Sequence, residues 1–204
     1  MDVTWKHPFS AIVSGPSGCG KTQFTLRFID HLQHMVKPNI EKVIWCYGIY
    51  QEIFDKYPQI QFHEGLPDLN IFDGKNRTLL VLDDLMAETD DRVTMLFTKI
   101  SHHKNVSILY LTQNLFYKNK HMRTISLNAH YLVLFKNVRD STQVASLARQ
   151  MFPGKSHFMI EAFADATMVP FGYLLVDLTA DSDERCRLRT NIFPGETHYV
   201  YMRK

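Results

Sequence analysis

Short apolar runs recur along the chain and alternate with segments whose apolar residues repeat at helical spacing. Residues 9–14 are apolar on both faces, as expected for a central strand of a parallel sheet. Other continuous or alternating apolar runs predict further strands in the same way. These lie at residues 43–47, 60–63, 78–84, 106–112, 131–135, 173–178 and 198–202.

Helices are predicted where apolar side chains fall at the i, i+3, i+4 and i+7 positions of one face. In residues 92–103 these side chains are Val93, Leu96, Phe97 and Ile100. The other predicted helices are residues 21–35, residues 50–56, a segment that begins after Asp140 or Ser141 and ends before Pro153, and residues 156–164. Strands that alternate with helices indicate an α/β fold with a mostly parallel sheet, covered by helices on both faces and joined by right-handed crossovers.

The clearest chemical signal follows the first strand, where the chain reads GPSGCGKT. This is the G-x-x-x-x-G-K-[ST] pattern in the strand–loop–helix setting that it requires. Glycines let backbone N–H groups curl around a polyphosphate, and the helix N-terminus presents its positive dipole end to the same anion. Lys21 is expected to reach the β- and γ-phosphates of ATP, and the Thr22 hydroxyl to take one position on Mg²⁺. The predicted nucleotide-binding residues are Gly15, Pro16, Ser17, Gly18, Cys19, Gly20, Lys21 and Thr22.

Two carboxylates, Asp83 and Asp84, end the buried run of residues 78–84 and form what looks like a Walker B element. In an open parallel sheet, ligands sit beyond the carboxyl ends of the strands. Asp83 can therefore hold, through water, the Mg²⁺ that Thr22 also meets. We expect Asp84 to orient or deprotonate the attacking water, where related ATPases often carry Glu. Taken alone, an Asp pair after a buried strand could equally cap a helix.

The next predicted strand, residues 106–112, ends in Gln113 and Asn114. An amide at that tip could contact both the γ-phosphate and the attacking water, so that bond cleavage is felt by the loop that follows. Gln113 is therefore the candidate sensor, although a Gln-Asn pair after a strand is usually only a turn. The strands at 43–47 and 60–63 leave room for an extra strand between the first strand and the Asp83 strand, which is the arrangement of RecA-like (ASCE) ATPases.

Composition narrows the class of protein. With 204 residues, 45% apolar and 22% charged, the chain fits one α/β domain with a substantial core. No apolar run is long enough to span a membrane, and three widely spaced cysteines suggest reduced thiols in an intracellular protein. A helix N-terminus can lower the pKa of a thiol such as Cys19; alternatively, Cys19 only occupies a variable loop position. The net charge of +2 argues against a protein that coats DNA, but not against a ring with a few basic groups in its pore.

Five segments in order, GPSGCGKT, LLVLDDLM, LFTKISHHKN, SILYLTQNLF and RTISLNAHYLVLFKNVRD, resemble the genome-packaging ATPases of large eukaryotic DNA viruses, the poxviruses among them, and of Maverick/Polinton-type elements. These belong to the FtsK–HerA superfamily, and the resemblance covers about residues 8–195. It implies an ATP-driven motor that assembles as a hexameric ring and pumps double-stranded DNA into a preformed capsid. Capsid or portal-vertex proteins are then the expected partners, at the intracellular site of virion assembly. Cellular translocases of the superfamily carry membrane or DNA-reading domains that are absent here, so sequence-specific loading would come from elsewhere.

In such rings an arginine of the neighbouring subunit completes the site, which is worth on the order of 10³–10⁵ in rate. The candidates are Arg123, in the expected loop after the sensor strand, and Arg139, just past the strand at 131–135. Each could equally be a surface or ion-pairing arginine. Residues 116–123 mix basic and aromatic side chains and could contact DNA phosphates or the next subunit, or form only a solvated loop.

Three rival functions remain open. Residues 137–140 resemble the guanine-reading motif of GTPases, but Val138 stands where that motif has lysine. A strong preference for GTP over ATP would favour a GTPase. A nucleotide kinase would usually carry an Arg-rich lid over its phosphates, and the sequence shows no such segment. A helicase or AAA-type remodeller would share the core, and strand displacement would reveal it. A nucleotide-gated scaffold would bind ATP without turnover, which the intact Lys21, Asp83 and Gln113 argue against.

Overall fold

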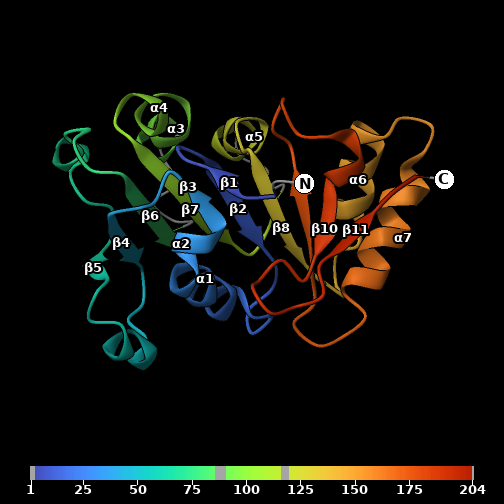
Figure 1. The fold of residues 1–204 in the computed structure, drawn as a ribbon, viewed down its shortest axis with the longest axis horizontal. Helices are drawn as coiled ribbons and strands as arrows, with labels where there is room; N and C mark the ends of the chain where they lie inside the picture. The colour runs from blue at the N-terminus through green and yellow to red at the C-terminus, as the bar shows by residue number, and fades with distance from the viewer. Residues whose placement is uncertain (1–2, 86–90, 116–119, 204) are drawn as a thin grey trace.

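The computed structural model describes residues 3–85, 91–115 and 120–203. Its described residues form a nine-stranded sheet in the order β11-β10-β9-β8-β2-β7-β6-β4-β5, and a two-stranded ribbon of β1 and β3. Figure 1 shows the large sheet running from β5 at one edge to β11 at the other, with β2 near the middle. The strands are β1 (Trp5–Lys6), β2 (Ser10–Ser14), β3 (Val36–Lys37), β4 (Lys42–Tyr47), β5 (Gln61–Glu64), β6 (Thr78–Asp83), β7 (Val106–Thr112), β8 (Tyr131–Phe135), β9 (Tyr173–Asp177), β10 (Leu188–Thr190) and β11 (Tyr199–Tyr201).

The sheet is parallel from β8 through β2, β7, β6 and β4 to β5, and antiparallel from β8 through β9 and β10 to β11. Central strands such as β2, β6 and β7 are buried along their whole length, as their near-continuous apolar sequences predict. The expected α/β class with a mostly parallel sheet is confirmed. All six parallel strands point their carboxyl ends to one edge, where the candidate site lies.

Helices cover both faces of the sheet. The α-helices are α1 (Lys21–Asp30), α2 (Leu32–Met35), α3 (Asp91–Met95), α4 (Ser101–His103), α5 (Lys120–Leu127), α6 (Thr142–Met151) and α7 (Ser156–Ala166). A π-helical turn, η4 (Leu96–Ile100), joins α3 to α4, and 3₁₀ turns lie at η1 (Glu52–Lys56), η2 (Leu69–Ile71) and η5 (Glu184–Cys186). Phe24 and Phe28 of α1 pack in the core on one face of the sheet, whereas Leu96, Ile125 and Ala162 pack in the core on the other. The longer helices therefore bury apolar side chains against the sheet, which separates two cores.

Three predicted helices differ from the structure. The helix expected over residues 50–56 is the short 3₁₀ turn η1 (Glu52–Lys56). The helix expected over residues 21–35 is broken at His31, whose backbone (φ −108°, ψ 13°) leaves the helical region and divides α1 from α2. The helix expected over residues 92–103 keeps its buried face but contains the π-helical turn. An apolar stripe fixes which face packs on the sheet, yet it does not fix the local hydrogen-bond pattern.

Three other expectations were wrong or incomplete. The strand that separates β2 from β6 is β7, not one of the strands at 43–47 and 60–63, which lie on the far side of β6. Arg123 lies on helix α5 rather than in a loop, because Met122 and Ile125 form a small buried stripe. Strand β10 was not predicted, since its three residues include a central arginine.

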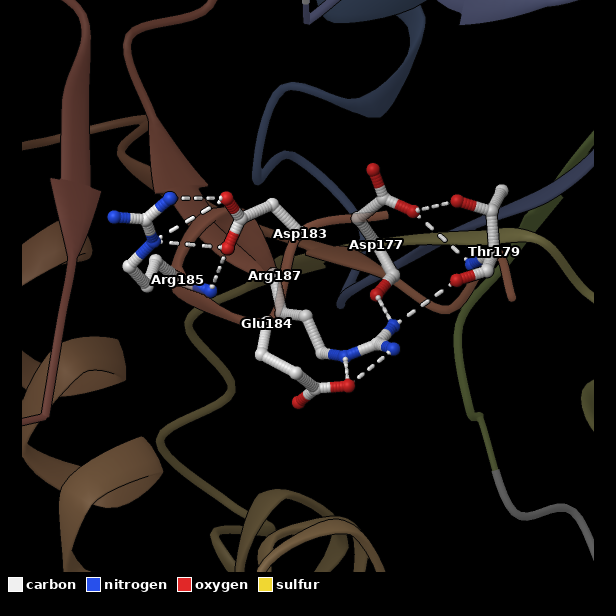
Figure 2. A network of polar contacts seen from close by, with 6 residues as sticks. All are labelled: Asp177, Thr179, Asp183, Glu184, Arg185 and Arg187. Atoms are coloured by element: carbon white, nitrogen blue, oxygen red, sulfur yellow. Dashed lines mark hydrogen bonds and ion pairs between the residues drawn. The ribbon is translucent and has the colours of Figure 1, made fainter. Parts of the chain in front are cut away.

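The turn between β9 and β10 is held by a polar network (Figure 2). Arg187 donates from Nη1 to the backbone oxygens of Asp177 (3.0 Å) and Thr179 (3.2 Å). It donates from Nε (2.9 Å) and Nη2 (2.6 Å) to Oε1 of Glu184. These contacts fix the corner that joins the antiparallel strands β9 and β10.

Candidate nucleotide-binding site

The loop between β2 and α1 has the backbone form of a phosphate cradle. Gly18 (φ 76°) and Gly20 (φ 106°) lie in the left-handed region that other residues rarely adopt. At Gly15, a Cβ would lie 2.6 Å from Sγ of Cys19 and 2.7 Å from Cβ of Phe135, so only glycine fits. The glycines of the motif are thus required by the shape of the loop.

Lys21 and the first turn of α1 supply positive charge to this loop. Lys21 is half-buried and donates from Nζ to the backbone oxygens of Gly15 (2.7 Å) and Pro16 (3.1 Å). In the described structure no side chain caps α1 at Gly20, so backbone N–H groups of its first turn remain available to an anion. Thr22 lies in that turn and is half-buried.

Asp83 lies at the end of β6 and is only 6% exposed. Burial raises its pKa from the ordinary 3.8 to about 6; the charge of Asp84 adds to this rise, and the charge of Lys21 opposes it. Lys21 and Asp83 are therefore close enough to act on each other electrostatically. A buried carboxylate beside the phosphate loop suits a divalent cation, because magnesium is usually held by one or two carboxylates together with substrate phosphates.

Two residues that the sequence analysis did not identify contact Asp83 and Asp84. Gln51 donates from Nε2 to Oδ2 of Asp83 (3.3 Å). Gly48 donates its N–H to the backbone oxygen of Asp83 (3.2 Å), and a Cβ at Gly48 would lie 3.1 Å from the backbone oxygen of Asp84. Asp84 itself is exposed, with φ 54°. No spacing signal marks Gln51 or Gly48, because their contacts exist only once β4 lies beside β6.

Gln113 follows directly after β7, which lies between β2 and β6. Thr112 pairs with Ser14 at the start of the phosphate loop, and Leu111 pairs with Asp83. Gly15 donates its N–H to the backbone oxygen of Thr112 (3.1 Å). Gln113 is exposed at this edge, between the phosphate loop and the carboxylates.

The loop after Gln113 is tied to α6. Leu115 donates its N–H to Oε1 of Gln143 (2.9 Å), and Gln143 donates from Nε2 to Oδ2 of Asp140 (2.7 Å). Residues 116–119, part of the segment considered for DNA or subunit contact, lie outside the described residues.

The two candidate arginines lie in different parts of the molecule. Arg139 is exposed in the turn after β8, at the same edge of the sheet as the phosphate loop. Arg123 is exposed on α5, which leads towards the opposite edge. There the backbone oxygen of Asn128 accepts from Oγ of Ser10, the first residue of β2 (2.6 Å). The structure therefore does not bring Arg123 and Arg139 together.

Cys19 is half-buried in the phosphate loop. Burial raises the pKa of its thiol, although the charge of Lys21 opposes this. This favours the view that Cys19 occupies a variable loop position over the view that it is an activated thiol.

The sheet order β8-β2-β7-β6-β4, with a glycine-rich loop between β2 and α1, defines an α/β P-loop NTPase fold of the RecA-like type. The comparisons with solved structures agree. The genome packaging NTPase B204 of Sulfolobus turreted icosahedral virus 2 in complex with AMPPCP matches with a TM-score of 0.57 and 11% identity, over 97% of this chain and 98% of that one. The same protein with ATP-gammaS matches with a TM-score of 0.56 and 10% identity, over 96% and 98%.

The cytoplasmic domain of the Type VII secretion ATPase EccC of Thermomonospora curvata matches with a TM-score of 0.54 and 13% identity, over 88% of this chain and 26% of that one. No protein-family model and no curated protein sequence matches the chain. At these identities the likeness concerns the fold, and it confirms the resemblance to packaging ATPases at that level. Among the described residues, none of the helices is long and apolar enough to cross a membrane.

The pKa of Asp83 gives a prediction about stability. A folded-state pKa raised to about 6 means that the folded protein binds this proton more tightly, so stability is lost as the pH rises from 3.8 through about 6. At neutral pH the charged carboxylate then costs about 3 kcal/mol. Asp83→Asn is therefore expected to raise the free energy of unfolding above pH 6 by up to that amount, with the gain shrinking as the pH falls towards 3.8. Urea unfolding over this range measures it.

The matched control is Asp73→Asn, at an exposed carboxylate away from the site. It is expected to show no such pH-dependent gain. A gain for Asp83→Asn that stayed the same at every pH would contradict the assignment of the effect to the Asp83 charge.

Proposed function

We propose that this protein is an ATP-hydrolysing motor that translocates double-stranded DNA and packages a viral or virus-like genome into a preformed capsid. The observation that carries the proposal is the convergence of Lys21, Asp83 and Gln113 at one sheet edge, on a fold shared with a packaging NTPase. The solved relative was captured with ATP analogues, which supports a nucleotide hydrolase.

In this proposal each residue of the edge has a distinct task. The loop of residues 15–22 wraps the phosphates with backbone N–H groups, and Lys21 neutralises charge on the β- and γ-phosphates. Thr22 and Asp83 would hold Mg²⁺, which supplies charge neutralisation to the phosphates when it is bound. Asp84 is exposed beside the buried Asp83 and would orient the attacking water or accept its proton.

Coupling to movement would begin at Gln113. Loss of the γ-phosphate changes what this amide can hydrogen-bond to, and its loop is tied to α6 through Gln143. Such a link between a phosphate sensor and a neighbouring element is how nucleotide hydrolysis moves switch segments. We further propose a homohexameric ring in which Arg123, or else Arg139, of one subunit completes the neighbour's site, with DNA in the pore and capsid or portal-vertex proteins outside.

The test measures ATP hydrolysis with and without double-stranded DNA, alongside the mass of the assembly. We expect DNA of any sequence to stimulate hydrolysis several-fold, and the stimulation to fall with added salt, because phosphate contacts dominate non-specific binding. Single-stranded DNA of equal length is the control. Stimulation by single strands alone, together with strand displacement, would favour a helicase, and a strong preference for GTP would favour a GTPase.

A further inference from the structure

We propose that the turn between α7 and β9, residues 167–172, is the nucleobase half of the site, and that Phe171 is the side chain on which the base stacks. The inference rests on the proposed nucleotide site and adds a recognition residue to it. Its first support is a cavity of about 350 Å³ that joins this turn to the phosphate loop. The cavity is lined by Gly18 and Cys19 on one side, by Lys136 and Val138 after β8, and by Met168 and Phe171 of the turn. Its volume is within the range of small-ligand sites.

The second support is an apolar patch at this cavity. Phe171 is 69% exposed, Val138 86%, Met168 73% and Val169 59%. Apolar side chains gathered at the mouth of a cavity are typical of ligand-binding grooves and of protein interfaces, and the adjoining phosphate loop favours a nucleotide here. A purine or pyrimidine ring offers the flat apolar face that such side chains match, and aromatic stacking suits any base.

The backbone holds Phe171 in this exposed position. Phe171 has φ 61°, in the left-handed region that bulky residues rarely adopt. The turn is closed by hydrogen bonds from the N–H of Gly172 to the oxygen of Val169 (3.0 Å) and from the N–H of Met168 to the oxygen of Asp165 (3.1 Å). A Cβ at Gly172 would lie 2.4 Å from the backbone oxygen of Ala166, so the close approach requires glycine. Strained backbone at the rim of a cavity is common at ligand sites.

The orientation expected for a nucleotide bound to the phosphate loop also places its base near Phe171. Asp83 and Gln113 lie on the β7 and β6 side of the phosphate loop, so the γ-phosphate is expected there. The base must then leave the loop on the other side of β2, where β8 and β9 lie. Phe171 is already in contact range of the loop: its Cδ1 is 3.2 Å from the position that a Cβ of Gly20 would take. The ring therefore stands where a base attached to loop-bound phosphates would arrive.

The test compares ATP with inorganic tripolyphosphate, which has the phosphates but no base. Binding of each ligand, with Mg²⁺, is measured by calorimetry for the unmodified protein, Phe171→Ala and Phe171→Trp. Since base stacking on an aromatic side chain is worth a factor of roughly 10 to 100 in affinity, we expect Phe171→Ala to weaken ATP binding by that factor. Tripolyphosphate binding by Phe171→Ala should change less than about twofold. Phe171→Trp should bind ATP about as tightly as the unmodified protein does. Tyr199→Ala, an exposed aromatic on β11, is the matched control and should change neither ligand.

Equal losses for both ligands would overturn the inference, because the loop itself would then be disturbed. Unchanged ATP binding in Phe171→Ala would also overturn it, and if that variant also changed the mass of the assembly, the patch would be a contact with a second copy of the chain. A protein that bound neither ligand would overturn this inference and the proposed site together. If ATP bound as expected but DNA failed to stimulate hydrolysis, the motor proposal would fail, whereas the assignment of Phe171 as the base-stacking residue would stand.

Discussion

Replacing Lys21 with alanine is expected to lower the rate of ATP hydrolysis at least about 100-fold, because one preorganised positive charge at a phosphoryl-transfer site is worth that much or more. Lys21 lies across the phosphate loop, with Nζ held by the oxygens of Gly15 and Pro16, and its charge acts on Asp83. Bound phosphates would offer this ammonium group far stronger partners than two carbonyl oxygens. Steady-state hydrolysis at saturating ATP and Mg²⁺ measures the effect.

The control for this variant is Lys155→Ala, an exposed lysine at the start of α7. It removes the same charge from the protein and is expected to leave hydrolysis unchanged. Lys21→Ala removes two half-buried hydrogen bonds and the charge that favours ionised Asp83, so we expect a modestly lower urea midpoint in a protein that stays folded. Near-normal hydrolysis by a folded Lys21→Ala protein would reject the phosphate site and every role assigned around it.

The central strands and the phosphate loop were predictable because their signals are local. A buried parallel strand needs apolar residues on both faces, which makes β2, β6 and β7 visible as unbroken runs. Carboxyl ends of parallel strands meet at one edge, so the same runs predicted that Asp83 and Gln113 lie near the loop. The roles of these residues in catalysis stay predictions.

Other features depend on contacts between distant segments. Gln51 and Gly48 contact the Asp83–Asp84 pair only because β4 lies beside β6, which no local pattern reveals. Helix α5 has too few apolar residues to stand out from a solvated loop. The exposed Phe171 resembles any aromatic residue in a turn until the neighbouring cavity is known.

Strand β10 was missed for a reason that leads to a prediction. Its central residue, Arg189, is only 2% exposed and donates from Nη2 to Oδ2 of Asp177 on β9 (2.9 Å). A charged residue normally argues against a buried strand, and the partner that makes it tolerable lies on another strand. Burial lowers the pKa of Arg189, and the charge of Asp177 opposes this. The Asp177–Arg189 ion pair therefore offsets the desolvation cost that either charge alone would impose on the core.

Asp177→Ala is expected to lower the free energy of unfolding by about 3–5 kcal/mol, because it leaves the Arg189 charge buried without its partner. It also removes the acceptor of the Thr179 N–H (3.0 Å) and hydroxyl (2.6 Å). Urea unfolding measures the loss. Removing both charges, in Asp177→Asn with Arg189→Met, should recover part of it, since a buried pair replaced by groups of similar volume is often close to neutral.

Figure 2 supplies the matched control in the same turn. Asp183 pairs with Arg185 through Oδ2 and Nη2 (2.7 Å), but this pair is exposed, and exposed pairs contribute little. Asp183→Ala should therefore change the unfolding midpoint far less than Asp177→Ala does. Equal losses in the two variants would mean that the turn as a whole, and not the buried Arg189 charge, sets the stability of the antiparallel end of the sheet. Because β9 pairs directly with β8, a large loss at Asp177 would also connect the antiparallel strands to the stability of the parallel sheet that carries the phosphate loop.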